Sequence, residues 1–327
     1  MKVAIDIGNG YIKAINEKGE RLHFPAVIKE SQEESILKNK NEYEMQIDGK
    51  NYFFGNLAII KRAARRWETG KSIHQDTEKY IALCAHLLSE EDKPEIELSL
   101  GLPYSYYIGL NRGEKLKEAL LDLKAKTEMK GKKTIHIKKV SVYPQGVGAY
   151  FANLYDITGQ PQAGAEDFIN SIYIDVGYRT IDVVAFQVLN GTFELVEENS
   201  FSLEEDGMFQ AMKEIARRIS KDFEITENDV DFAIRHKGSV FESMYGEIDF
   251  KKIEQEEYQK LSEKIGTEIN VKLSGDLPRY RNLFLTGGGA DKLYPFMKKK
   301  YPHIQIQEDF IFCNAKGYLA LENTKVD

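Results

Sequence analysis

The chain contains few cysteines, no long hydrophobic run and no excess of basic residues. Its two cysteines, Cys84 and Cys313, are too few and too isolated for a disulfide framework or a zinc site, so we expect two buried thiols. No apolar run approaches the roughly 20 residues that a membrane-spanning helix needs. The first residues form a predicted strand rather than a signal peptide. We therefore expect a cytoplasmic protein with no membrane span.

The charge balance limits the kind of partner. The formal net charge of −7 argues against a surface-wide nucleic-acid platform, because such binding needs concentrated Lys and Arg. We expect no direct nucleic-acid binding. The densest basic runs lie at residues 61–67 and 298–300. We interpret them as solvated helix faces or loops, or as subunit contacts in a polymer-forming protein.

Two segments about 170 residues apart have nearly the same pattern. Residues 5–13 read IDIGNGYIK and residues 174–182 read IDVGYRTID. Each pattern predicts a β-hairpin with a tight glycine turn and an acidic residue beside it. Glycine turns let backbone N–H groups approach phosphate oxygens, and the acidic residue can hold Mg²⁺ directly or through water. A third segment, LFLTGGGA at residues 283–290, predicts a strand that leads into a loop able to pass close to a base or ribose.

The order of these segments is more specific than any one of them. This order, which runs from a hairpin through a connecting segment to a second hairpin and a strand with three glycines, resembles that of the superfamily that contains actin, hexokinase and the heat-shock chaperones. Within it, the chain is most similar to the ParM-type bacterial and archaeal actin-like proteins. The similarity extends along the chain and includes the segments GLPYSYY at residues 101–107 and YPQGVGA at residues 143–149.

The resemblance implies an α/β class and a duplicated actin-like (ribonuclease H-like) fold, with two domains flanking a nucleotide cleft. A length of 327 residues suits two domains or one duplicated fold. We expect domain I at residues 1–158, with a small inserted subdomain at about 29–74. Domain II would span residues 159–327, with a subdomain at about 203–275 and a final helix that packs back toward the cleft. Local patterns also predict a hairpin at residues 43–54, a helix at 111–126 and a strand at 193–201.

The first hairpin would hold phosphates. We expect Asp6 near the metal and the terminal phosphates, although it could simply cap the turn. Side chains alternate along a strand, so Lys13 points to the same side as Tyr11. Its place resembles that of the family's phosphate-contacting lysine, while a strand lysine by default faces solvent. The turn residues that would offer N–H groups to phosphate are Gly8, Asn9, Gly10 and Tyr11.

The second hairpin would complete the phosphate and metal site. Asp175 would hold the Mg²⁺ shell or the attacking water. Arg179 departs from the small or hydroxyl residue of many relatives, and both a phosphate contact and a solvent-facing position remain open. Asp182 resembles the family's strand aspartate, which is either structural or catalytic. The residues that would wrap the β and γ phosphates are Gly177, Tyr178, Arg179 and Thr180.

Hydrolysis needs a group that orients water in line with the leaving phosphate, and Gln145 is our candidate. A glutamine positions water without acting as a strong base, which predicts slow turnover. The alternative is a polar residue that only begins a helix. The segment that resembles the adenosine motif comprises Thr286, Gly287, Gly288, Gly289 and Ala290. Three charged residues, Lys213, Glu214 and Arg217, could reach the ribose or base, or form one solvated helix face.

The resemblance implies a nucleotide-dependent, filament-forming protein that binds and slowly hydrolyses ATP or GTP with Mg²⁺. Such filaments move plasmid or other DNA, with a DNA-binding adaptor protein as partner, or act as a prokaryotic cytoskeleton. The alternative is a small-molecule kinase or phosphatase of the same superfamily, for which the sequence offers no convincing carbohydrate-binding segment. A chaperone-like module is disfavoured, because no substrate-binding domain follows residue 327.

Overall fold

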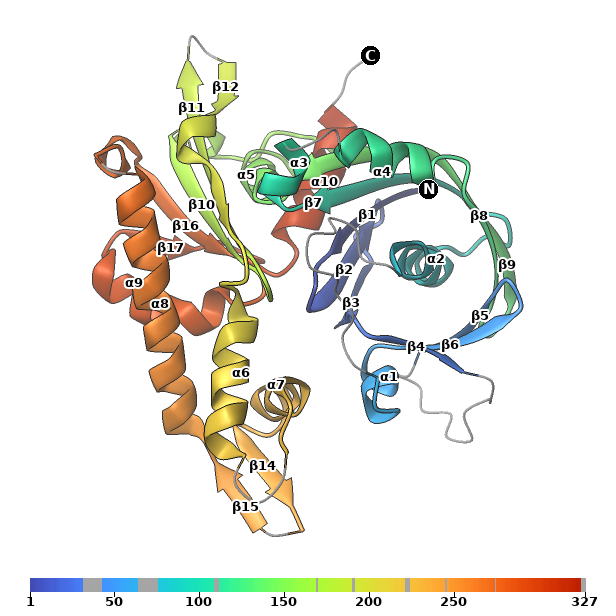
Figure 1. Cartoon of the computed structure of the whole chain (residues 1–327). Coiled ribbons are helices and arrows are strands. Elements are labelled where there is room, and N and C mark those ends of the chain that lie inside the picture. Colours follow the sequence, from blue (N-terminus) through green and yellow to red (C-terminus); the bar gives the residue numbers. More distant parts are fainter. Residues whose placement is uncertain are drawn as a thin grey trace. The chain divides into compact units, whose positions relative to one another are not determined.

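The chain forms two compact units in the computed structural model (Figure 1). The structure describes residues 1–31, 43–63, 76–108, 112–168, 170–189, 192–220, 224–244, 246–273 and 275–324. Unit 1 comprises Met1–Ile169 and Glu308–Asp327, and unit 2 comprises Asn170–Gln307. Parts of the expected inserted subdomain and of the basic run at 61–67 lie outside the described residues.

Unit 1 is built on one large sheet, which curves around helix α2 (Thr77–Leu88) (Figure 1). Its strand order is β3-β2-β1-β7-β9-β8-β5-β6-β4. Strand β1 pairs antiparallel with β2 and parallel with β7. The strands are β1 (Lys2–Ile7), β2 (Tyr11–Asn16), β3 (Arg21–Pro25), β4 (Ile28–Ser31), β5 (Tyr43–Ile47), β6 (Lys50–Phe54), β7 (Glu95–Leu102), β8 (Lys124–Glu128) and β9 (Lys132–Pro144).

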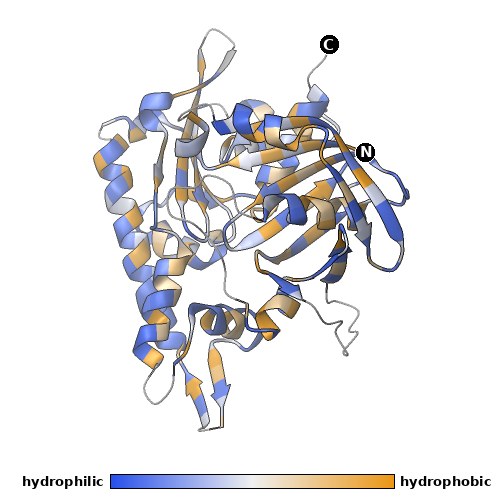
Figure 2. Ribbon diagram, turned by 45° about the vertical axis from the view of Figure 1, so that its right-hand side comes forward, coloured by the Kyte–Doolittle hydropathy of each residue, from blue (hydrophilic) through white to orange (hydrophobic). Residues whose placement is uncertain are grey.

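The core of unit 1 lies between this sheet and α2. Helix α2 buries Tyr80, Leu83 and Cys84 in the same cluster as Val3 and Ile5 of β1. Figure 2 shows hydrophobic residues concentrated along the strands of the sheet. Cys313 is buried as well, so the expectation of two buried thiols is confirmed. The other helices of unit 1 are α1 (Asn56–Ile60), α3 (Tyr104–Ile108), α4 (Arg112–Leu120), α5 (Val147–Leu154), a 3-10 turn (Ala165–Phe168) and α10 (Cys313–Thr324).

Helices α5 and α10 cross at two glycines. An ideal Cβ on Gly317 would lie 1.8 Å from the carbonyl oxygen of Gly148, so only glycine permits this approach. Asn314 of α10 accepts hydrogen bonds from the backbone N–H groups of Gly146 (3.0 Å) and Ala149 (3.2 Å) at the start of α5. These contacts make α10 part of unit 1, whereas the sequence grouped it with the second domain.

Unit 2 repeats the central arrangement of unit 1. Strand β10 pairs antiparallel with β11 and parallel with β16, as β1 does with β2 and β7. The sheet order is β12-β11-β10-β16-β17, with β13 also paired to β11. The strands are β10 (Ser171–Val176), β11 (Ile181–Leu189), β12 (Thr192–Leu195), β13 (Phe201–Leu203), β16 (Asn282–Thr286) and β17 (Ile304–Ile306), with a separate hairpin β14 (Val240–Ser243) and β15 (Gly246–Asp249).

The helices of unit 2 pack by amphipathic faces. Helix α8 (Lys251–Leu273) buries Tyr258, Leu261, Ile265 and Ile269, the three- and four-residue spacing of one helix face. Much of its remaining surface is hydrophilic (Figure 2). The other elements are α6 (Met208–Ile219), α7 (Glu227–His236), α9 (Ala290–Lys300) and short 3-10 turns at Glu197–Asn199 and Leu277–Arg279.

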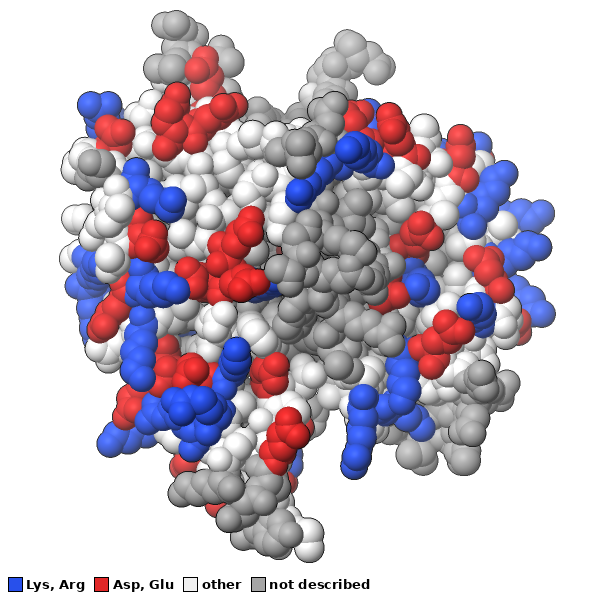
Figure 3. Space-filling model, in the orientation of Figure 1, with Lys and Arg blue, Asp and Glu red and all other residues white. Residues whose placement is uncertain are grey.

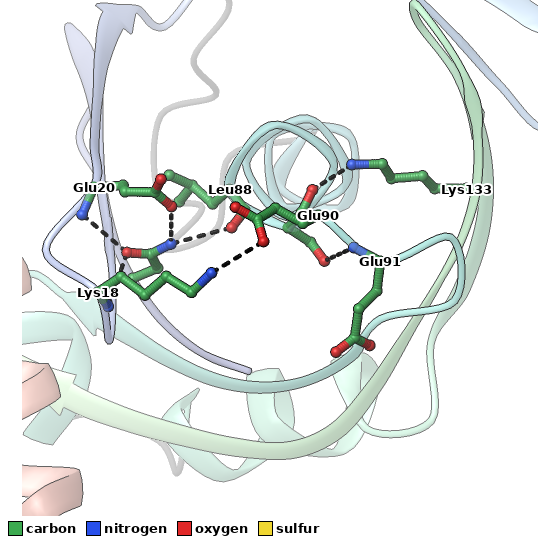
Figure 4. A network of polar contacts seen from close by, with 8 residues as sticks. Lys18, Glu20, Leu88, Glu90, Glu91 and Lys133 are labelled. Carbon is green, nitrogen blue, oxygen red and sulfur yellow. Dashed lines mark hydrogen bonds and ion pairs between the residues drawn. The ribbon is translucent and has the colours of Figure 1, made fainter.

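A buried asparagine holds the far end of the β1–β2 hairpin. Asn16, fully buried, accepts hydrogen bonds from the backbone N–H groups of Lys18 (3.1 Å) and Glu20 (2.9 Å). Its amide nitrogen donates to the carbonyl oxygen of Leu88 at the end of α2 (3.1 Å). Figure 4 shows this network, together with the 3.3 Å ion pair between Lys18 and Glu90. The turn between β2 and β3 is therefore fixed to α2.

Three local predictions had different outcomes. The hairpin at 43–54 is confirmed, and Asp48 (φ 48°) and Gly49 (φ 85°) form its turn. The helix expected at 111–126 is too long, because α4 ends at Leu120 and Asp122 adopts φ 60°. Residues after it alternate in burial and form β8. The single strand expected at 193–201 is divided into β12 and β13 by a 3-10 turn.

Candidate functional site

The first glycine turn is closed by its own backbone. The N–H of Gly8 donates to the carbonyl oxygen of Tyr11 over 3.2 Å, and an ideal Cβ on Gly8 would lie 2.9 Å from that oxygen. The carbonyl oxygen of Gly10 accepts a hydrogen bond from the N–H of Ala26 at 2.8 Å, which ties the turn to the end of β3. Asn9 lies between the two glycines and is partly exposed. The turn is thus tight and fixed on both sides.

Asp6 is the centre of a buried polar cluster beside this turn. Asp6 and Lys13 are directly opposite in the β1–β2 register, and Lys13 Nζ lies 2.8 Å from Asp6 Oδ2. The amide nitrogen of Gln145 donates to Asp6 Oδ1 at 2.9 Å. All three side chains are buried. Lys13 therefore does not face solvent, contrary to the default for a strand lysine.

The contact with Asp6 fixes the orientation of the Gln145 amide. An ionised carboxylate only accepts hydrogen bonds, so the NH₂ group of Gln145 must face Asp6 and its carbonyl oxygen must face away. The backbone N–H of Gln145 donates to the carbonyl oxygen of Leu102 at 2.6 Å, which holds the residue between β9 and α5. Asn314, which caps the start of α5, supports the same region. No local pattern indicates this capping role, because residue 314 is remote from α5 along the chain.

The second glycine turn is held by the first turn of α6. The N–H groups of Gly207, Met208 and Phe209 donate to the carbonyl oxygens of Arg179 (2.9 Å), Gly177 (3.1 Å) and Tyr178 (2.7 Å). Gly177 also donates its N–H to the carbonyl oxygen of Thr180 at 3.0 Å. An ideal Cβ on Gly207 would lie 2.5 Å from backbone atoms of this turn, so α6 can approach it only through a glycine.

The second hairpin carries two buried aspartates and a partly exposed arginine. Asp175 and Asp182 are buried and directly opposite in the β10–β11 register. Asp182 accepts hydrogen bonds from the hydroxyl groups of Ser202 and Thr180, the latter at 3.3 Å, which gives it a structural role. Arg179 forms an ion pair with Glu205 at 2.8 Å.

The three-glycine loop lies against Asp175. Thr286 is fully buried and is the register partner of Asp175 in the β10–β16 pair. Gly287 has φ 82°, and an ideal Cβ there would lie 2.0 Å from Asp175 Oδ1. An ideal Cβ on Gly289 would lie 2.6 Å from side-chain atoms of Val176 and Met208, whereas one on Gly288 would meet nothing within 4 Å. The loop then enters α9 at the buried Ala290, so unit 2 brings its predicted hairpin and glycine loop together.

The three charged residues of α6 form part of a solvated face. Arg217 is 71% exposed and pairs with Glu214 at 2.8 Å, and Lys213 is also exposed. Figure 3 shows acidic and basic side chains intermingled over the face in view. Among the described residues, no cluster of three or more His, Cys, Asp or Glu side chains could hold a metal ion. No helix in the described ranges has the length and hydrophobicity to cross a membrane.

Comparison with known proteins matches each unit to a family model of actin-like proteins. The family "Actin like proteins N terminal domain" matches residues 4–148, and "Archaeal actin homologue MreB-like, C-terminal" matches residues 173–299. A curated archaeal actin homolog of Thermoplasma acidophilum is 26% identical, with 97% of each chain covered.

Solved structures show the same two-domain fold. A ParM from Clostridium botulinum, determined as a 15-stranded filament, aligns with a TM-score of 0.82 and 22% identity over 98% of both chains. An archaeal actin homolog in complex with ADP aligns with a TM-score of 0.78 and 22% identity, also over 98% of both chains. The predicted duplicated α/β fold is thereby confirmed.

Proposed function

The chain belongs to the actin-like proteins, and we propose that it binds ATP or GTP with Mg²⁺, hydrolyses the nucleotide slowly and assembles into filaments. The observation that carries this proposal is the buried Asp6–Lys13–Gln145 cluster beside a closed glycine turn. A hydrophobic core that only stabilises the fold would not require a buried ion pair and a buried amide at this place. A polyphosphate site would, because it needs a cation, a metal-binding carboxylate and a group that orients water.

The residues fit phosphate and magnesium. Lys13 supplies a fixed positive charge beside the turn of Gly8 to Tyr11, whose backbone is tight enough to approach a phosphate. Each oxygen of Asp6 accepts one hydrogen bond and keeps a further lone pair, which suits an ion held through water. Asp175 would be the metal-binding carboxylate of unit 2. Bound Mg²⁺ would neutralise charge on the phosphates.

Gln145 would orient the attacking water. Its carbonyl oxygen faces away from Asp6 and can accept a hydrogen bond from a water molecule. An amide cannot remove a proton as a strong base does, so turnover would be slow. Hydrolysis at that rate suits a timer for filament disassembly more than a metabolic reaction.

The loop of residues 286–290 would receive the nucleoside. Gly288 faces open space, and its neighbours hold the loop tightly against Asp175, Val176 and Met208. A flat base or ribose could therefore approach the backbone there. Lys213, Glu214 and Arg217 would reach the nucleoside only from the solvated side of α6. We further propose that the filaments move DNA through an adaptor protein or serve as a prokaryotic cytoskeleton.

The test follows light scattering and phosphate release after Mg-ATP or Mg-GTP is added to the purified protein. We expect a nucleotide-dependent rise in scattering that decays as phosphate appears. Phosphate transfer that occurs only with a small-molecule acceptor, without scattering, would instead establish the kinase alternative. Asp175→Ala should slow phosphate release by about a hundredfold, as loss of one charge-stabilising group does.

A second pair of variants isolates the role of Gln145. Gln145→Ala should bind nucleotide as the wild type does and release phosphate more slowly. Gln259→Ala is the matched control, because Gln259 is exposed on α8 and its side chain donates to Glu263, at 2.9 Å, in the same helix. Loss of nucleotide binding in Gln145→Ala would show a structural role for that side chain and contradict the water-orienting assignment.

A further inference from the structure

Arg179 is the one basic residue in a long acidic stretch of the sequence. Residues 170–212 contain this arginine and no lysine, together with eight aspartates and glutamates. Arg179 lies in the turn between β10 and β11, and under the proposed function phosphate would approach that turn. The corresponding hairpin of unit 1 has a lysine opposite its aspartate, whereas this hairpin has two aspartates opposite each other. Attraction of phosphate by a basic side chain of the second hairpin therefore depends on Arg179.

The ion pair between Arg179 and Glu205 is buried unequally. Nη2 of Arg179 lies 2.8 Å from Oε1 of Glu205. The arginine side chain is only 14% exposed, whereas the glutamate side chain is 57% exposed. The guanidinium is thus largely covered by protein, while the carboxylate is in contact with solvent. If the pair opened, Glu205 would stay hydrated.

The backbone holds Glu205 beside the turn. On one side of it, Leu203 is the register partner of Ile181 in the β11–β13 pair. On the other side, the N–H of Gly207 donates to the carbonyl oxygen of Arg179 at 2.9 Å. Glu205 itself has φ 62°, a left-handed conformation that residues with a side chain rarely adopt. Figure 1 shows α6 beginning next to the end of this hairpin, so the loop that carries Glu205 is short and tied to the turn at both ends.

The next acidic residue has a different partner. Asp206 forms an ion pair with Lys264 of α8. Two consecutive acidic side chains are therefore directed to two different elements, Asp206 to α8 and Glu205 to the glycine turn. The pairing of Glu205 with Arg179 follows from this backbone geometry.

The two cations of the proposed phosphate site differ in how readily they can change partner. Lys13 pairs with the buried Asp6, and withdrawal of the lysine would leave a carboxylate buried and unpaired, which is costly. Opening the Arg179–Glu205 pair costs little, because ion pairs with an exposed member contribute little to stability. A guanidinium can also bind phosphate through two parallel hydrogen bonds, which are strong and specific. Arg179 can therefore exchange a carboxylate for a phosphate, whereas Lys13 would keep its partner.

We propose that Glu205 is a displaceable counter-ion, which holds Arg179 until a phosphate group of the nucleotide takes its place. The inference rests on the proposed nucleotide-binding function and concerns the same site. It assigns Arg179 as a phosphate-binding residue and Glu205 as a residue that limits affinity, because the carboxylate competes with phosphate for the guanidinium. Removal of the charge of Glu205 should accordingly strengthen binding, an effect that a purely structural ion pair would not produce.

The test measures dissociation constants by isothermal titration calorimetry with Mg-ATP, Mg-GTP and Mg-pyrophosphate. Glu205→Gln keeps the size of the side chain and should tighten binding by about two- to fivefold, the range expected for a partly exposed ion pair. Arg179→Gln should weaken binding at least tenfold, about the effect of losing a charge-assisted contact to phosphate. The double variant R179Q/E205Q should match R179Q to within about twofold, because no arginine is left to be released.

Glu198→Gln is the matched control. Glu198 is an exposed acidic residue of the same unit and lies in the 3-10 turn Glu197–Asn199. Its substitution removes the same charge, and its dissociation constants should stay within about twofold of those of the wild type. Urea midpoints are measured for every variant. A gain of affinity cannot come from misfolding, so Glu205→Gln tests the exchange even if Arg179→Gln is unstable.

The outcomes separate this inference from the proposed function. If the wild type binds nucleotide and Glu205→Gln binds it no more tightly, the exchange is wrong and the proposed function stands. Tightening that persists in R179Q/E205Q, or that Glu198→Gln reproduces, would also overturn the exchange, because it would reflect general repulsion between acidic residues and phosphate. If the wild type binds neither nucleotide nor pyrophosphate, the proposed function itself fails.

Discussion

The crossing of α5 and α10 at two glycines predicts how much a substitution there lowers the free energy of unfolding. In Gly317→Ala, the new Cβ would lie 1.8 Å from the carbonyl oxygen of Gly148 and 2.7 Å from its Cα. Ordinary contacts begin at 3.4 Å, so the two helices would have to separate by about 1.6 Å. Both neighbouring atoms belong to backbone, which cannot rotate away as a side chain does. The substitution should therefore displace the helices rather than be absorbed locally.

The free-energy cost is the balance of three effects. Overpacking costs about 1–3 kcal/mol. Separation of the helices also strains the two hydrogen bonds from Gly146 and Ala149 to Asn314, each worth about 1 kcal/mol. Alanine gains about 1 kcal/mol over glycine within a helix. We expect Gly317→Ala to lower the free energy of unfolding of unit 1 by about 2–4 kcal/mol.

Urea unfolding followed by circular dichroism, without nucleotide, measures this effect. Gly113→Ala is the matched control, because Gly113 lies in α4 of the same unit and its new Cβ would meet the Tyr107 ring at an ordinary 3.4 Å. The control should be neutral or slightly stabilised. The close-contact reasoning is refuted if Gly317→Ala unfolds at the same urea concentration as Gly113→Ala. Since Asn314 caps α5 next to Gln145, we also expect slower phosphate release.

Further predictions concern the buried charges and the glycine loop. Lys13→Met leaves Asp6 without its cation and should lower the free energy of unfolding of unit 1, measured with urea, by about 3–5 kcal/mol. The double variant D6N/K13M should have a stability closer to that of the wild type. Equal stability of the single and the double variant would contradict a buried ion pair. Burial, aided by the charge of Lys133, lowers the pKa of His86 below its ordinary 6.5, so the unfolded chain binds a proton more readily. Stability should therefore be full above about pH 6.5 and fall as the pH decreases below it, and His86→Gln should flatten that part of the urea-midpoint profile. Gly287→Ala should weaken nucleotide binding at least tenfold in equilibrium dialysis, because the new Cβ would meet Asp175. Gly288→Ala is the control, because a Cβ at that position would meet no atom within 4 Å.

The sequence was most informative where structure is local. Both glycine hairpins, the turn at Asp48–Gly49 and the strand that leads into Gly287 follow from short patterns, since glycine and alternating burial determine them within a few residues. Their roles in nucleotide binding stay predictions. The helix after residue 111 was extended too far because the apolar spacing continues past Asp122, where the left-handed backbone ends it.

Contacts between residues far apart in the sequence could not be predicted from local patterns. The burial of Lys13 depends on Asp6 opposite it and on Gln145, which approaches from the start of α5. The place of α10 in unit 1 depends on Gly148 and Gly317, whose mutual approach no local pattern encodes. In both cases the determining partner lies far along the chain, and propensity or periodicity contains no information about it.

The two hairpins share a backbone plan but differ in charge at the same register position. In unit 1 Asp6 faces Lys13, a compensated pair, whereas in unit 2 Asp175 faces Asp182. Like charges directly opposite each other on a sheet are destabilising, and hydroxyl donors from Ser202 and Thr180 offset this at Asp182. Under the proposed function, unit 1 would contribute a cation to the phosphates, while a bound metal ion would relieve the repulsion in unit 2. Lys13→Met and Gly287→Ala perturb these two contributions separately, so each hairpin can be tested by itself.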